Sequence, residues 1–146
     1  MKIVDQSREH AVAVFRIVFG FLFVCHGAKL LFGVFGGKDP VAFGVWPTWW
    51  VSIIQLVAGA AVVLGIGTRI AALLCSGSMA YAYFTVHQPG GLLPIENGGE
   101  PAAMFSFGFL LIAILGAGSW ALSSAFQRSS ADPAAGQSSA EIEAAS

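Results

Sequence analysis

Long stretches without any charged residue dominate this 146-residue chain. No Asp, Glu, Lys or Arg occurs in residues 40–68, 70–95 or 101–127, and an apolar run over residues 14–33, VFRIVFGFLFVCHGAKLLFG, precedes them. A helix needs about 20 mostly apolar residues to cross the hydrocarbon core of a bilayer. Because only helices and closed barrels satisfy their own backbone hydrogen bonds in lipid, the sequence predicts four transmembrane helices.

The composition supports the same class of protein. Hydrophobic residues make up 56% of the chain and charged residues 10%, against about 25% charged residues in a typical soluble domain. The formal net charge is −1, with 7 Lys and Arg residues. This balance argues against nucleic acid as a partner and favours membrane lipids.

We expect one all-α domain over residues 11–123, an integral membrane bundle of four helices that alternate in direction. The connection GIGTR is so short that the second and third spans must form an antiparallel hairpin. Residues 1–10 are expected to be a short N-terminal segment, and residues 124–146, rich in Ala, Ser and Gly, a disordered tail. The expected spans are residues 11–33, 48–67, 69–88 and 102–122.

The distribution of basic residues predicts the orientation, because cytoplasmic segments of membrane proteins carry an excess of Lys and Arg. One side of the predicted bundle has more of them than the other. The richer side holds Lys2, Arg8, Arg16, Arg69 and Arg128, and the other holds Lys29 and Lys38. Both termini are therefore expected in the cytoplasm.

Arg16 and His26 are the least expected residues of the first span. On a helical wheel Arg16 shares its face with Gly20 and Gly27, and small residues mark helix–helix contacts in membranes. We therefore expect Arg16 to point inward, either as a structural anchor or as a functional residue, since ionisable residues inside a membrane are candidates for function. His26 lies in the outer half of the span and has the same two alternatives.

Other polar residues are expected to join the helices. The Gln55 amide must find a partner, because an unsatisfied amide in hydrocarbon costs several kcal/mol. Ser76 and Ser106 lie on the small-residue faces of the third and fourth spans and are expected to form hydrogen bonds between helices. Glu100, followed by Pro101, is typical of a helix start. The alternative for Glu100 is proton transfer at the outer mouth, together with His87 and Glu96.

The sequence predicts no metal site and no disulfide. The histidines and carboxylates have no metal-ligand spacing. Cys25 and Cys75 are expected at different depths in the bundle, too far apart for a disulfide. We therefore expect no cofactor, with a quinone as the one alternative.

Three segments resemble the DoxX family of small bacterial membrane proteins. They are RIVFGFLFVCHGAKLLFG, QLVAGAAVVLGIGTRIAALLCSGSMAYA and NGGEPAAMFSFGFLLIAILGAGSWAL, which together cover about residues 10–123. The resemblance implies a four-helix bundle in the bacterial cytoplasmic (inner) membrane. It also implies a link to membrane redox and oxidative-stress assemblies, because the family takes its name from a subunit of a thiosulfate:quinone oxidoreductase.

The chain departs from the family pattern at two places. The family often has Glu where this chain has Gln55, so a charged partner for Arg16 is missing. The family's ending resembles G-P-G-x-x-S-L-D, whereas this chain has Ala117 and Ser123 at the Pro and Asp positions. Both departures argue against a proton step that depends on a carboxylate.

Three functional hypotheses follow. The first is an accessory or scaffold subunit, not catalytic alone, that associates with other membrane redox proteins; a homo-oligomer is also compatible with this hypothesis. The second is a quinone-reactive subunit, with His26, Tyr83 and His87 as the candidate catalytic groups and quinone contacts. The third is a small-solute transporter or channel, in which Arg16 and Gln55 would line the path.

Overall fold

The computed structural model describes residues 2–37 and 39–123. Within these ranges all of the regular secondary structure is helical, which confirms the predicted all-α class. The predicted disorder of residues 124–146 lies outside the described residues. The elements are α1 (Lys2–Phe32), α2 (Thr48–Leu64), α3 (Thr68–Ala82), the π-helical segment η1 (Tyr83–His87), the 3₁₀ segment η2 (Gln88–Gly90), α4 (Pro94–Asn97) and α5 (Glu100–Leu115).

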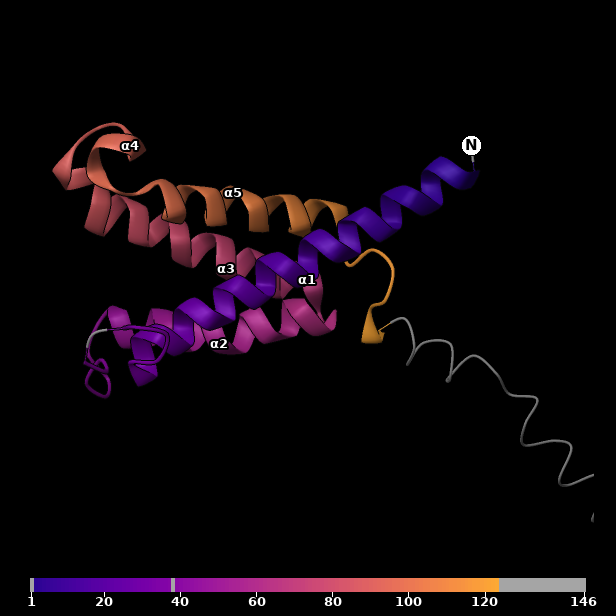
Figure 1. The fold of residues 1–146 in the computed structure, drawn as a ribbon. Helices are drawn as coiled ribbons and strands as arrows, with labels where there is room; N and C mark the ends of the chain where they lie inside the picture. The colour runs from indigo at the N-terminus through magenta and orange to yellow at the C-terminus, as the bar shows by residue number, and fades with distance from the viewer. Residues whose placement is uncertain (1, 38, 124–146) are drawn as a thin grey trace, which may run out of the picture.

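The four long helices pack as two pairs. Helix α1 lies along α2, and α3 lies along α5 (Figure 1). Contacts of α2 with α3 and of α1 with α5 join the pairs, and successive long helices run in opposite directions. At the end where α2 begins and α3 runs into η1, the two pairs diverge (Figure 1).

Glycines bring α1 and α2 close together. A Cβ atom at Gly20 would lie 3.2 Å from the carbonyl oxygen of Gly59, and one at Gly27 would lie 3.0 Å from that of Ser52. These distances are too short for a relaxed contact, so only glycine permits this backbone approach. The small-residue face of the first helix is therefore its packing face, and Arg16 belongs to it.

A thin core lies between the helices. Phe23 from α1 and Phe109 from α5 are fully buried, and their ring centroids lie 4.6 Å apart. Val62, Cys75 and Ile112 complete the centre of the core. Each long helix thus contributes a narrow stripe to the core and leaves its remaining apolar residues on the outside.

The hairpin between α2 and α3 depends on two glycines. Helix α2 ends at Leu64, and Gly65 caps it in the left-handed conformation (φ 75°). The amide of Ile66 then donates to the carbonyl of Ala61 at 3.0 Å, as in a glycine-terminated helix. Gly67 is also left-handed (φ 53°) and precedes the first turn of α3. The short connection therefore reverses the chain, as the sequence indicates.

Two helix ends differ from the predicted spans. Helix α5 ends at Leu115, so the predicted fourth span, residues 102–122, extends beyond the helix. The chain turns there because Gly116 (φ 88°), Gly118 (φ 62°) and Trp120 (φ 61°) are all left-handed. Helix α1 begins at Lys2 and so includes most of the segment that was expected to precede the first span.

Two helical stretches are long and apolar enough to cross a membrane, Gln6–Phe32 and Thr68–Gly90; α2 and α5 are apolar but shorter. Only 28% and 33% of the most apolar windows in the two long stretches are buried. The core helix of a soluble protein would be mostly buried, whereas here the apolar surface faces outward. These features indicate a membrane protein.

Candidate functional site

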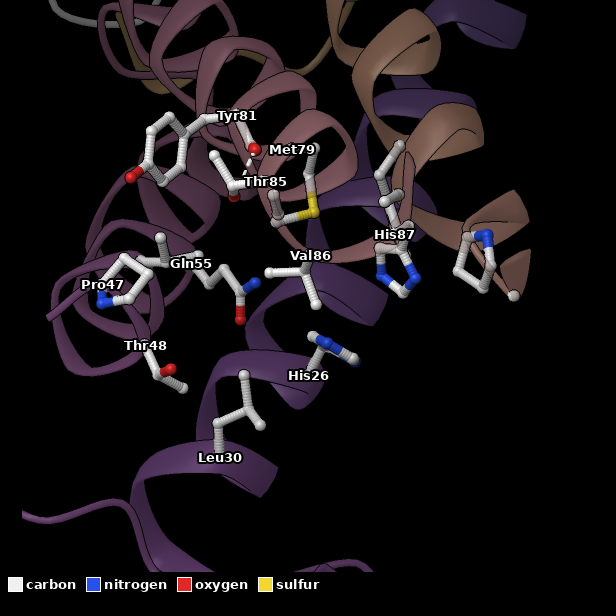
Figure 2. Close-up of a pocket in the computed structure, with 16 residues that line it drawn as sticks. His26, Leu30, Pro47, Thr48, Gln55, Met79, Tyr81, Thr85, Val86 and His87 are labelled. Carbon is white, nitrogen blue, oxygen red and sulfur yellow. Dashed lines mark hydrogen bonds between the residues drawn. The ribbon is translucent and has the colours of Figure 1, made fainter. Parts of the chain in front are cut away.

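A cavity of about 330 Å³ opens where the two helix pairs diverge (Figure 2). Its walls come from the C-terminal half of α1, the start of α2, the segment from α3 into η1, and the start of α5. The volume lies at the lower end of the range for ligand pockets, about 300–1,000 Å³. Most of the lining is apolar, and it contains no Asp, Glu, Lys or Arg from residues 2–37 and 39–123. The polar side chains of the lining are His26, Thr48, Gln55, Tyr81, Thr85 and His87.

Gln55 on α2 is the most deeply buried polar group of this cavity. Its side chain is 1% exposed, and its Oε1 atom has no hydrogen-bond partner within the described part of the chain. Figure 2 shows the amide projecting from α2 into the space between the helix pairs. A buried acceptor without a partner costs about 1–3 kcal/mol. The cavity therefore holds a polar atom that a bound donor would satisfy.

The π-helical segment η1 forms the opposite wall. It is an interruption that follows α3 directly, and such π turns occur frequently at functional sites. Within it the Thr85 hydroxyl donates to the carbonyl of Tyr81 at 2.7 Å. The His87 Nδ1 atom lies 3.3 Å from the carbonyl oxygen of Asn97. The segment thus presents Thr85 and His87 to the cavity, each already bonded to a backbone carbonyl.

The segment between η2 and α5, residues 91–99, holds Asn97 in place for its contact with His87. The Asn97 side-chain nitrogen donates to the carbonyl of Gly91 at 2.8 Å, and its Oδ1 atom accepts from the amide of Gly99 at 2.8 Å. Gly99 itself is buried and precedes α5 directly. His87 is therefore oriented by a loop that these two hydrogen bonds of Asn97 hold in place.

His26 lies on α1, across the cavity from η1. Figure 2 shows its ring on the side of α1 toward which the His87 ring projects. His26 is exposed although it lines the cavity. The structure thus brings two of the three proposed quinone contacts, His26 and His87, into one cavity with Gln55.

Tyr83, the third proposed contact, lies elsewhere. It lines a second cavity, together with Ser106, and its hydroxyl donates to the carbonyl of Leu92 at 3.3 Å. Tyr83 and His87 are four residues apart, a spacing that places two residues on similar sides of a helix. The structure nevertheless puts them in different cavities, because Tyr83 lines the second cavity with Ala80, whereas His87 lines the main one. Tyr81 lines the main cavity instead.

Arg16 lies at the opposite end of the bundle and is fully buried. Its guanidinium donates to the carbonyls of Val62 and Val63 at 2.5 and 2.6 Å, in the last turn of α2. It also donates to Ala117 at 2.8 Å and to Trp120 at 3.3 Å, after the end of α5. The last carbonyls of a helix lack partners within it and carry partial negative charge. Arg16 therefore caps α2 and fixes the segment after α5 without any carboxylate.

The remaining candidates have local structural contacts. The Ser76 hydroxyl donates to the carbonyl of Ser106 at 2.8 Å and so joins α3 to α5. Glu100 is exposed at the first position of α5, followed by Pro101. Ser123 donates to the carbonyl of Gly65 at 2.8 Å, so the position where the family pattern has Asp holds a hydroxyl bonded to the α2–α3 connection.

Cys25 and Cys75 are both free. Among the residues that the structure describes, no group of three or more His, Cys, Asp or Glu side chains is placed to hold a metal ion. Sequence reasoning did not single out Thr85, Tyr81 or the Asn97 carbonyl. Their place in the site depends on η1 and on the loop over residues 91–99. No spacing of residues in the sequence indicated either feature.

Comparison with known proteins gives a family but no activity. The DoxX family matches residues 11–88, slightly more than half of the chain. An uncharacterized protein of Haemophilus influenzae is 37% identical over 137 residues, which cover 86% of this chain and 98% of that protein. No solved structure gives a significant match. The family match and the full-length relative agree with the resemblance carried by the sequence motifs, and the chain therefore belongs to the DoxX family.

Proposed function

We propose that this protein is an accessory subunit of a membrane redox assembly and that it holds a lipophilic ligand of the quinone class in the cavity beside Gln55. The observation that carries the proposal is the unpaired Oε1 atom of Gln55, a buried side chain that lines a mostly apolar cavity. Buried polar groups in folded proteins almost always have partners. A ligand that brings a hydrogen-bonding group to this depth supplies the missing partner.

The rest of the cavity suits a ring with an apolar tail. Its lining combines aliphatic and aromatic side chains with a few polar groups, which is the usual pattern of a small-molecule site. The cavity opens beside His26 toward the apolar exterior of the helices. A ring with oxygen substituents can therefore occupy the cavity while its hydrocarbon tail remains in lipid. We assign the chain no reaction of its own.

The proposal places the protein in the bacterial inner membrane as a multi-pass protein with both termini in the cytoplasm. The excess of basic residues at the end that contains Arg69 supports this orientation. Outward-facing apolar side chains on every long helix provide surface for lipids and for a membrane partner, as an accessory subunit requires. The family supports the redox setting.

The same observations give less support to the hypothesis of a small-solute transporter or channel. Arg16 already donates to four backbone carbonyls, so its guanidinium is occupied. Its partners Val62 and Val63 lie about 11 Å along α2 from Gln55, taking a rise of about 1.5 Å per residue. Arg16 and Gln55 therefore belong to separate ends of the bundle and do not line one path.

A direct binding experiment tests the proposal. The full chain, purified in detergent, is equilibrated by dialysis against a decyl-substituted benzoquinone and its reduced form, and the bound ligand is measured by mass spectrometry. We expect saturable binding of at least one form, weakened about tenfold in Gln55→Leu, because one buried hydrogen bond is lost. Gln6→Leu, far from the cavity in α1, is the matched control. Absence of binding of both forms, or unchanged binding in Gln55→Leu, would overturn the proposal.

The assembly is tested separately in native membranes. Gentle solubilisation and affinity capture of the tagged protein should bring down a respiratory or thiol-redox enzyme. Blue-native electrophoresis should show the two proteins in one complex. A capture that yields the protein alone under several mild detergents would contradict the accessory role.

A further inference from the structure

We infer that the cavity selects the reduced, hydroxyl-bearing form of its ligand over the oxidised, carbonyl form. The inference rests on the proposed function and deepens it, because it concerns which redox form the same cavity holds. It follows from the direction of the hydrogen bonds that the polar side chains of the cavity already make. On the wall formed by η1, these bonds leave lone pairs, and not hydrogen atoms, for the ligand.

His87 has a fixed tautomer. Its Nδ1 atom lies 3.3 Å from the Asn97 carbonyl oxygen. A carbonyl oxygen can only accept, so in the neutral ring Nδ1 carries the hydrogen and Nε2 carries a lone pair. His87 lines the cavity, and Figure 2 shows one of its ring nitrogens turned toward the side where Gln55 lies. His87 therefore presents an acceptor to the cavity.

Thr85 presents a second acceptor. Its single hydroxyl hydrogen is directed to the carbonyl oxygen of Tyr81 at 2.7 Å. A hydroxyl has one hydrogen and two lone pairs. Once the hydrogen is used in this bond, the Thr85 oxygen offers only lone pairs to a ligand in the cavity that it lines.

The other polar side chains of the lining can serve either form of the ligand. The Gln55 amide has an acceptor and two donors, the Thr48 and Tyr81 hydroxyls can donate or accept, and neutral His26 offers one donor and one acceptor. The two groups of η1 cannot change roles without breaking their backbone bonds. A ligand oxygen that lies against η1 therefore meets acceptors only.

The ligand must also be neutral. Among the described residues, no Asp, Glu, Lys or Arg lines the cavity, and a charge buried without a counter-ion is strongly disfavoured. A hydroquinone or a substituted phenol meets both conditions, because it is neutral and its hydroxyls donate to lone pairs. A quinone carbonyl in the same place would face the lone pairs of His87 and Thr85. The two redox forms of one ring therefore differ in the bonds they can make.

The experiment compares the two forms on the same protein. Binding of a decyl-substituted benzoquinol, kept reduced under anaerobic conditions, and of the corresponding quinone is measured by equilibrium dialysis on the full chain at pH 7. We expect the quinol to bind at least tenfold more tightly, as one or two extra hydrogen bonds to the ligand would give. Equal affinity, or tighter binding of the quinone, would overturn this inference and leave the proposed function standing. Absence of binding of both forms would overturn the proposed function itself.

Two variants test which side chains cause the preference for the quinol. His87→Phe and Thr85→Val each remove one acceptor, so each should lower the quinol-to-quinone affinity ratio severalfold. The matched controls are His10→Phe, at the far end of α1, and Ser78→Ala. Ser78 makes a comparable bond to the Cys75 carbonyl but does not line the cavity.

The ratio is the measured quantity, because partial unfolding lowers the capacity for both ligands together and leaves their ratio unchanged. Both controls should keep the ratio of the unaltered chain. An unchanged ratio in both His87→Phe and Thr85→Val would contradict the inference, even if the total binding fell.

Discussion

At the scale of single residues, Gln55 and Arg16 show two different solutions for a polar group inside this bundle. Arg16 has backbone carbonyls for all of its inward-facing donors. Gln55 is buried to the same degree and leaves an acceptor unpaired. The first arrangement stabilises the fold, whereas the second costs stability in the absence of a ligand. This contrast separates a structural residue from a binding residue and can be measured.

Gln55→Leu should stabilise the ligand-free protein. Replacing an unsatisfied amide by an apolar group of similar volume removes a penalty of about 1–3 kcal/mol. We expect a higher midpoint of thermal unfolding in detergent, measured by circular dichroism, together with weaker ligand binding. A lower midpoint would mean that the amide has a partner in the free protein.

Arg16→Met should destabilise the protein strongly. The change removes the donors that cap α2 and leaves carbonyls at its C-terminus without partners, for which we expect a loss of about 2–4 kcal/mol. Arg16→Lys should cost less but still lower the midpoint of unfolding, because an ammonium cannot span the positions that the planar guanidinium joins. If Arg16→Lys had the same midpoint of unfolding as the unaltered protein, the hydrogen bonds from the guanidinium to several carbonyls would not contribute to stability.

At the scale of the elements, apolarity predicted the existence of the long helices better than their ends. The charge-free runs correspond to α2, to α3 with η1, and to α5. They do so because each of these helices carries apolar side chains both on its buried face and on its outer face. The end of α5 at Leu115 could not be predicted in this way, since Gly116–Ser119 is as free of charge as the helix before it. Left-handed residues end the helix, and composition does not reveal backbone angles.

The candidate site was predictable in part for the same reason. An α-helical wheel correctly grouped the inward residues of α1, which is a regular helix. It did not indicate that Tyr83 and His87 line different cavities. Gln55 stood out in the sequence as the single amide of its span, yet only the structure shows that it lines a cavity as well as packing against α1.

Gly27→Ala should loosen the pairing of α1 and α2. The added Cβ atom would lie 2.8 Å from the Gln55 Cβ atom and 3.0 Å from the Ser52 carbonyl oxygen, so the helices must move apart. We expect a loss of about 1–3 kcal/mol, typical of an overpacked contact, measured by thermal unfolding. Gly77→Ala is the matched control, because nothing lies within 4 Å of its added Cβ atom. Equal stability of the two variants would contradict the close approach.

At the scale of the whole molecule, the alternating helices put Arg69 and Glu96 at opposite ends (Figure 1). The proposed membrane topology predicts that these ends lie on opposite sides of the bilayer. Arg69→Cys and Glu96→Cys, each in a chain in which Cys25 and Cys75 are replaced by Ala, are treated with a membrane-impermeant maleimide. In intact cells stripped of the outer membrane, only the cysteine at position 96 should react. Reaction of both would refute the topology.

The buried contacts of Arg16 also affect the order in which the chain can fold during synthesis. Arg16 lies in α1, which is synthesised before Ala117 and Trp120, two of its acceptors. Until those two residues have been made, the guanidinium lacks half of its partners. We therefore expect α1 to reach its final packing only after the segment that follows α5 has been synthesised.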